Sequence, residues 1–174
     1  MAHAGAFSAF RFWSGLLAIV LLCDAWVVLS ESRLPATVMT KWTADRATSF
    51  MTRDQWIHWS LVFVTVPSLL VAAGLRATTR RWPRLIHPGV AAMSPPEQAR
   101  VMPIVDRGSF ILAGAIALWF TAFHFIIVRA NETSPPTRET WPVLVWTLAL
   151  LVVVGAGVLV FHQRLRRALA REGG

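Results

Sequence analysis

The stretch FILAGAIALWFTAFHFIIV, residues 110–128, decides the fold of this chain, because it contains no Asp, Glu, Lys or Arg. A hydrocarbon core about 30 Å thick is crossed by roughly 20 helical residues, which is close to the length of this stretch. Lipid offers no hydrogen-bond partner to the backbone, so an apolar stretch of this length crosses it as a helix. We therefore predict a transmembrane helix here.

Three more apolar stretches of similar length accompany this one. Over the whole chain, 55% of the residues are hydrophobic and 15% are charged, against about 25% charged residues in ordinary soluble domains. The sequence therefore predicts an all-α polytopic membrane protein that forms a single domain over residues 1–174. The four predicted transmembrane helices are residues 12–29, 56–75, 110–128 and 141–161, with an outer loop at 30–55 and a cytoplasmic loop at 76–109.

Positive charge distinguishes the two sides of the predicted bundle. Of the 17 Lys and Arg residues, eleven lie in the N-terminal flank, the 76–109 loop and the C-terminal tail, and six lie in the other two loops. Lys and Arg accumulate in cytoplasmic loops. We therefore expect both termini in the cytoplasm and the chain in the cell membrane.

The segment Ser94-Pro95-Pro96-Glu97 has the pattern of a helix start, with a capping Ser, Pro at the first position and Glu three residues after the cap. It predicts a short cytoplasmic helix before the third span. Pro103 is expected to limit the length of that helix, because proline lacks an amide donor.

The net charge of +8 raises the question of a nucleic-acid partner. The arginines cluster beside the apolar stretches without a base-recognition motif, so the expected partner is the lipid bilayer and not a nucleic acid. Cys23 is the single cysteine, which excludes an internal disulfide and a Cys-rich metal motif. Familiar catalytic motifs are also missing, and we predict a non-enzymatic protein with no metal and no cofactor.

Three polar residues lie in the outward half of the predicted spans: Asp24 in the first, His58 at the start of the second and His124 in the third. A carboxylate at the centre of a membrane helix costs roughly 2.5–3.5 kcal/mol on insertion scales, so it usually faces other helices and has a partner. Three interpretations stay open. The residues form a proton, metal or haem site, Asp24 shares a buried hydrogen bond with a His, or they are separate polar residues that clamp helices or stay wet near the surface.

The first outer loop has an ordered series of residues, Arg33-Leu34-Pro35-Ala-Thr-Val38-Met-Thr-Lys41-Trp42, and it closes with Phe50-Met51-Thr52-Arg53. The Leu-Pro pair, the Trp and the closing Arg resemble the bacterial family called domain of unknown function 1648. That family usually has His where Lys41 stands and a glycine turn where Ala44-Asp45-Arg46 stands, so a role that depends on that His is not carried over. Ser94-Pro-Pro-Glu97-Gln-Ala-Arg100 resembles its Pro-Glu-Arg segment, and His124 followed by Arg129-Ala-Asn131 resembles the end of its third span.

The resemblance extends over residues 34–131 and consists of short motifs. It implies a bacterial multi-pass membrane protein, similar to the membrane part of immunity proteins that protect bacteria from their own toxin peptides. Most members of the family have no assigned activity. The partners that it implies are a peptide or another membrane protein.

Two hypotheses of function follow. A loop of about 25 residues usually does more than connect two helices, which favours a protein that binds or senses a partner through Leu34, Pro35, Lys41 and Trp42. The alternative is a small transporter or a subunit of a membrane complex, with a site built on the three intramembrane polar residues. Four helices are few for a transporter, so the alternative requires an oligomer or a larger complex.

Overall fold

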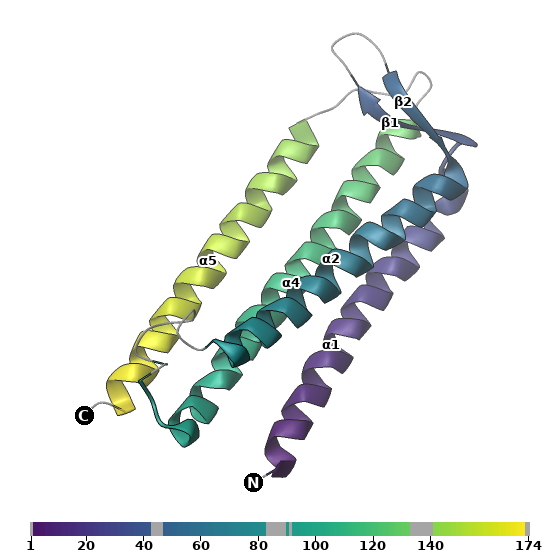
Figure 1. Cartoon of the computed structure of the whole chain (residues 1–174). Coiled ribbons are helices and arrows are strands. Elements are labelled where there is room, and N and C mark those ends of the chain that lie inside the picture. The colour runs from purple at the N-terminus through teal and green to yellow at the C-terminus, as the bar shows by residue number, and fades with distance from the viewer. Residues whose placement is uncertain (1, 43–46, 83–89, 91, 133–140, 173–174) are drawn as a thin grey trace.

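Four long helices lie side by side in the computed structural model, which describes residues 2–42, 47–82, 90, 92–132 and 141–172 (Figure 1). All four are long and apolar enough to cross a membrane, which confirms the predicted number of spanning helices. Each begins earlier or ends later than the apolar stretch that predicted it. The helices are α1 (Ala2–Leu29), α2 (Arg53–Arg81), α4 (Pro95–Asn131) and α5 (Trp141–Glu172).

The fold is mainly helical, as predicted, but the segment between α1 and α2 corrects the predicted outer loop, because it contains a β-hairpin. A 3-10 turn, η1 (Glu31–Arg33), leads into β1 (Thr37–Trp42), which pairs antiparallel with β2 (Ala47–Thr52). The hairpin lies at one end of the bundle, and α1 begins and α5 ends at the other (Figure 1). We call these the hairpin end and the termini end.

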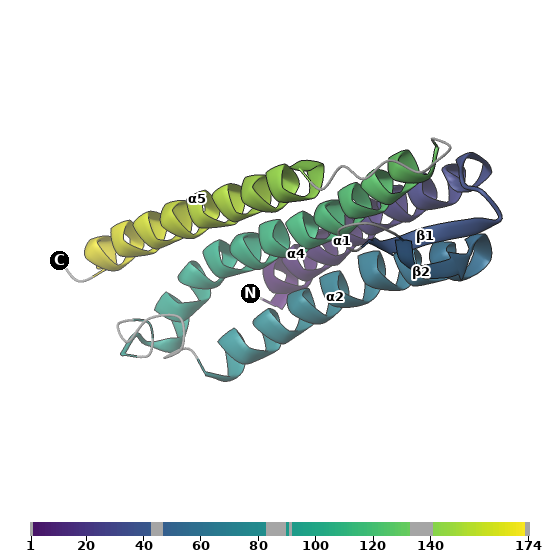
Figure 2. The same cartoon turned by 90° about the horizontal axis from the view of Figure 1, so that it is seen from above.

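The core lies between α1, α2 and α4, which pack closely along their length (Figure 2). Small residues permit this approach, since Ala72 of α2 and Ala113 and Ala117 of α4 are completely buried. Gly15 of α1 faces the ring of Phe110, and a Cβ atom at Gly15 would lie 3.2 Å from that ring. Larger apolar side chains fill the rest of the interface: Leu16, Val20, Val27, Val64 and Ile127.

Helix α5 is attached differently from the other three. It packs along α4 on the outside of the bundle (Figure 2), and every residue of Thr147–Arg164 is at least partly exposed. At the contact, Gly108 of α4 accommodates the ring of Phe161, which would lie 3.2 Å from a Cβ atom at that glycine. The bundle is therefore a three-helix core with a peripheral fourth helix.

The start of α4 confirms one prediction and corrects another. The backbone N–H of Ser94 donates to Glu97 Oε2 over 2.7 Å, so the expected capping box is present. The helix does not stop near Pro103 but runs unbroken to Asn131. Pro103 is exposed and close to the helix start, where water can solvate the carbonyl that its missing N–H leaves without a donor.

Candidate functional site

His124 is the centre of a buried polar network near the hairpin end. Its side chain is 1% exposed, and it is held between Ser30 at the end of α1 and Ser60 of α2. The Nε2 atom lies 2.7 Å from Ser30 Oγ, and the Nδ1 atom lies 2.8 Å from Ser60 Oγ. Trp56 stacks on the imidazole, with ring centroids 5.8 Å apart and an interplanar angle of 9°. His124 therefore joins all three core helices.

The hydrogen bonds of Ser30 determine the direction of the network. Ser30 Oγ donates its single proton to the carbonyl of Val27 over 2.7 Å, so it accepts from Nε2–H of His124. In a neutral imidazole the Nδ1 atom then accepts, and Ser60 Oγ donates to it. Every polar atom of the ring has a partner, and a metal ion would have to displace one of the two serines to bind here.

The structure does not bring Asp24, His58 and His124 together. Asp24 Oδ2 accepts a hydrogen bond from Thr65 Oγ1 of α2 over 2.8 Å. Its Oδ1 atom is buried without a partner among the described residues. His58 is exposed, and among the aromatic contacts of the described residues its ring meets only that of its neighbour Trp59, edge-on. Of these interpretations, the geometry matches separate polar residues, of which Asp24 and His124 clamp helices and His58 stays exposed.

A second set of polar contacts attaches the hairpin to α4. The side chain of Asn131, the last residue of α4, binds the backbone of Met39 in β1 in both directions. Its Oδ1 atom accepts from Met39 N over 2.8 Å, and its Nδ2 atom donates to Met39 O over 3.0 Å and to Ile127 O over 2.9 Å. Asn131 thus occupies part of the outer edge of β1 as a neighbouring strand would. Val38, completely buried, packs the same strand onto the apolar core.

Ion pairs also connect the segment that leads into the hairpin to the end of α4. Arg33 Nε of η1 donates to Glu132 Oε1 over 2.7 Å, and Arg129 Nη1 donates to Glu132 Oε2 over 3.1 Å. Burial by itself would raise the pKa of Glu132, but the hydrogen bonds and charges of the two arginines hold this pKa below its ordinary value of 4.5. The charged form of Glu132 therefore stabilises the folded hairpin.

This linkage predicts a pH dependence of stability. Because the folded-state pKa of Glu132 is lowered, its contribution is present above the ordinary pKa and is lost as the pH falls through the folded-state value. The thermal midpoint of the wild type is expected to exceed that of Glu132→Gln at pH 7, and the gap is expected to close below pH 4.5. A gap that stays constant across this range would contradict the assigned role of the carboxylate.

Among the residues that the structure describes, no strand pairs with the outer edge of β2, and this edge carries an exposed aromatic residue. Phe50 pairs with Met39 in the register of the hairpin. Since Met39 turns its backbone N–H and C=O away from β2 toward Asn131, Met39 and Phe50 form a non-hydrogen-bonded pair. The N–H and C=O of Phe50 therefore point to the outer edge of β2. Its ring is 58% exposed and alternates with Met51, which packs on the core.

The four residues predicted as a partner site differ in their exposure to solvent and in the elements to which they belong. Leu34 is 4% exposed and belongs to the apolar core, so a partner cannot reach it without opening the bundle. Pro35 is exposed. Lys41 and Trp42 lie in β1, and their side chains are outside the described part of the structure. Leu34 therefore anchors the hairpin to the core, and of the four residues only Pro35 has a described side chain that is exposed.

The termini end holds a buried ion pair that the sequence interpretation missed. Arg76 of α2 is 6% exposed. It donates two hydrogen bonds to Asp106 of α4, from Nε to Oδ1 over 2.9 Å and from Nη2 to Oδ2 over 3.1 Å. Arg80 adds a third at 3.2 Å. The guanidinium carbon of Arg76 also lies 4.4 Å from the ring centroid of Phe12 in α1. In the sequence, Arg76 counted only as one of many cytoplasmic charges, and Asp106 as a loop residue.

Comparisons with protein-family models, with curated proteins and with solved structures find no match to this chain. The resemblance to the domain of unknown function 1648 therefore stays a prediction. Within the described residues, no group of three His, Cys, Asp or Glu side chains is arranged to hold a metal ion.

Proposed function

We propose that this chain is a non-enzymatic multi-pass protein of the bacterial cell membrane, which binds an extended peptide segment of a partner along the outer edge of β2. In this arrangement the hairpin faces outward and both termini lie in the cytoplasm. The excess of Lys and Arg in the segments at the termini end supports this orientation, because positive charge is retained on the cytoplasmic side.

The open edge at Phe50 is the observation that carries the proposal. Its outward N–H and C=O offer one donor and one acceptor to an added strand, and its exposed ring offers an apolar contact beside them. Strand addition obtains affinity from main-chain hydrogen bonds and specificity from side-chain contacts. An exposed, unpaired strand edge is otherwise a liability that proteins usually cover or charge.

The way in which the hairpin is attached favours binding. A two-stranded hairpin alone is marginally stable in water, but here Asn131 and Glu132 of the α4 terminus hold it through direct hydrogen bonds. The strand edge is therefore ordered before a partner arrives, which lowers the entropic cost of association. The network around His124 supports the bundle directly beneath it, since Ser30 is followed by η1.

The resemblance to the domain of unknown function 1648 favours a peptide as the partner, because members are similar to the membrane part of immunity proteins against toxin peptides. The alternative function, transport through an Asp/His site, has less support. Asp24 and His124 bind hydroxyl groups on other helices and do not meet each other or His58.

Photo-crosslinking from the full chain in bacterial membranes tests the proposal. A benzophenone amino acid replaces Asp54, whose side chain is 89% exposed two residues beyond β2. We expect crosslinked peptide adducts in the wild-type background and their loss in Phe50→Pro. Proline removes the outward N–H of residue 50, and at this position it leaves the bonds between β1 and β2 intact.

The matched control is Phe50→Leu, which keeps both the backbone N–H and an apolar side chain and is expected to keep the adducts. Cys23, the single cysteine, is buried, so its protection from a maleimide verifies that each variant is folded. The same adducts at the same yield in a folded Phe50→Pro variant would overturn strand addition as the mode of binding.

A further inference from the structure

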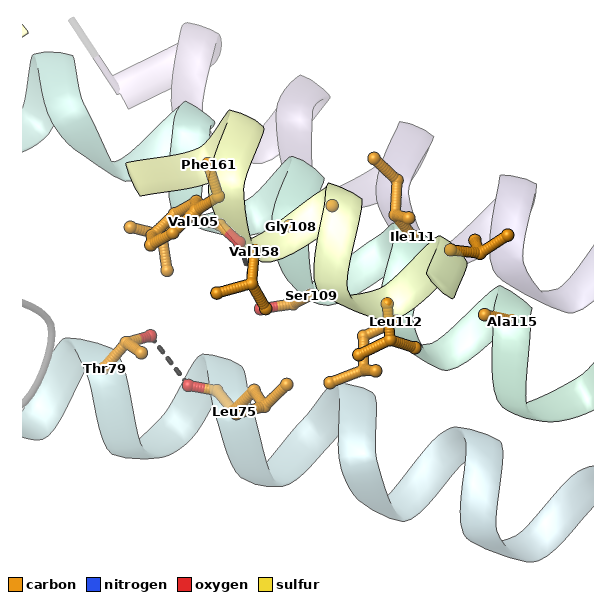
Figure 3. A pocket seen from close by; sticks show the side chains of 13 residues that line it. Leu75, Thr79, Val105, Gly108, Ser109, Ile111, Leu112, Ala115, Val158 and Phe161 are labelled. Atoms are coloured by element: carbon orange, nitrogen blue, oxygen red, sulfur yellow. Dashed lines mark hydrogen bonds between the residues drawn. The ribbon is translucent and has the colours of Figure 1, made fainter. Parts of the chain in front are cut away.

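The loose attachment of α5 leaves a cavity on each side of its contact with α4. The cavity on the α2 side, about 340 Å³ in volume, is mainly apolar, with the hydroxyl groups of Thr79 and Ser109 in its lining (Figure 3). The cavity on the opposite side is larger, about 610 Å³, and is formed by α4 and α5 alone. The two cavities adjoin, because four residues line both of them: Gly108, Ile111, Gly157 and Phe161.

The larger cavity, which we call the basic groove, combines three arginines with an apolar floor. Arg107 comes from α4, and Arg164 and Arg167 come from α5. The floor contains Ile104, Ile111 and Val160. On α5, residues 157, 160, 164 and 167 recur at helical spacing, so the apolar floor and the charged rim form one continuous stripe.

The three arginines have no counterion in the part of the chain that the structure describes. Each is exposed, and no hydrogen bond or ion pair joins Arg107, Arg164 or Arg167 to another described residue. Arg76 and Arg80 are different, because both bind Asp106. The groove thus presents three guanidinium groups, which suit bidentate binding of phosphate oxygens.

We propose that the basic groove binds one anionic phospholipid, with its phosphate between the arginines and an acyl chain along the floor beside α5. Basic pockets between transmembrane helices on the cytoplasmic side are the type of site that holds anionic headgroups. The apolar floor is complementary to an acyl chain, so a phospholipid fits the groove better than inorganic phosphate, which has no apolar part. A second copy of this chain would bring the same positive charge to the groove and is disfavoured by repulsion.

Native mass spectrometry of the full chain in mild detergent tests the proposal, with titrations of phosphatidylglycerol, phosphatidylcholine and inorganic phosphate. We expect phosphatidylglycerol to bind at least about tenfold more tightly than phosphatidylcholine, and inorganic phosphate not to displace it. Arg107→Gln/Arg164→Gln is expected to weaken phosphatidylglycerol binding by about tenfold or more, since each basic residue contributes roughly 1 kcal/mol toward anionic lipid. Arg81→Gln/Arg166→Gln removes the same charge outside the groove and is expected to change binding by less than about twofold.

Two leucine substitutions distinguish lipid binding inside the groove from general attraction of anionic lipid to basic residues. A Cβ atom at Gly157 or at Gly155 meets no protein atom within 4 Å, but only Gly157 lines the groove. Gly157→Leu is expected to reduce phosphatidylglycerol binding with every arginine in place, and Gly155→Leu is expected not to. Equal binding of the two lipids, displacement by inorganic phosphate, or equal binding by Gly157→Leu and wild type would each overturn the proposal.

Discussion

Asp106→Asn is expected to lower the free energy of unfolding by about 3–5 kcal/mol, the cost typical of leaving one member of a buried ion pair without its partner. The substitution keeps the size of the side chain but leaves the guanidinium of Arg76 with no carboxylate at a site where it is 6% exposed. Arg80 also loses its acceptor, but it is 53% exposed and can turn to water. The penalty therefore arises almost entirely from Arg76.

The reaction of Cys23 with a thiol-reactive dye during heating measures this effect. Cys23 is buried on α1, at the interface with the other core helices, so its reaction reports the opening of the bundle. In Asp106→Asn we expect the reaction at a much lower temperature than in the wild type.

A double variant separates the charge from the packing. Arg76→Met/Asp106→Leu removes both charges and fills similar space with apolar atoms, so we expect it to be more stable than Asp106→Asn. Arg81→Gln is the control, because Arg81 is exposed and its loss is expected to change stability by less than about 0.5 kcal/mol. An Asp106→Asn variant that unfolds with the wild type would show that the pair is not needed for stability.

His124→Ala is expected to lower the free energy of unfolding by about 3 kcal/mol, since it removes a large buried side chain and leaves polar groups unpaired. The variant leaves a cavity beside Trp56 and removes the common partner of Ser30 and Ser60. Because Ser30 directly follows α1 and Ser60 belongs to α2, the variant also disconnects the three core helices beneath the hairpin. The hairpin itself is expected to remain paired, since Asn131 holds it independently.

His58→Ala is the matched control, since it is the same substitution at an exposed position near the same end. We expect its stability to be within about 0.5 kcal/mol of wild type, measured by the same Cys23 reaction. Similar losses in His58→Ala and His124→Ala would mean that the serine network does not provide the stability. Trp56→Ala offers an independent check, because it removes the stacked ring and keeps both serine hydrogen bonds.

Sequence patterns predicted the helical part of the fold because membrane insertion depends on local composition. Residues 110–128 are apolar over the length of a bilayer, and this property requires no knowledge of neighbouring segments. The same holds for the start of α4, where Ser94 and Glu97 are three residues apart and cap their own helix. The expectation for Pro103 was wrong because this proline is exposed near the start of α4, where water can solvate the carbonyl that loses its donor.

The hairpin could not be predicted in the same way. Its strands are short, and their stability comes from contacts with distant residues: Val38 packs on the core, and the backbone of Met39 binds Asn131, 92 positions away. Residues 37–40 and 49–52 contain Val, Thr, Met and Phe, which tolerate a strand. Such a composition permits a hairpin but does not distinguish it from an irregular loop.

The candidate sites also combine properties that are local in the sequence with contacts between distant residues. The sequence by itself determined that the chain has four helices long and apolar enough to cross a membrane, that Asp24 and His124 lie in apolar stretches and that arginines cluster beside the ends of these stretches. Only the tertiary structure decided the partners: Thr65 for Asp24, Ser30 and Ser60 for His124, and Asp106 for Arg76. Hydropathy is a sum over neighbouring residues, whereas a polar contact between helices depends on the rotation and depth of each helix, which packing alone sets.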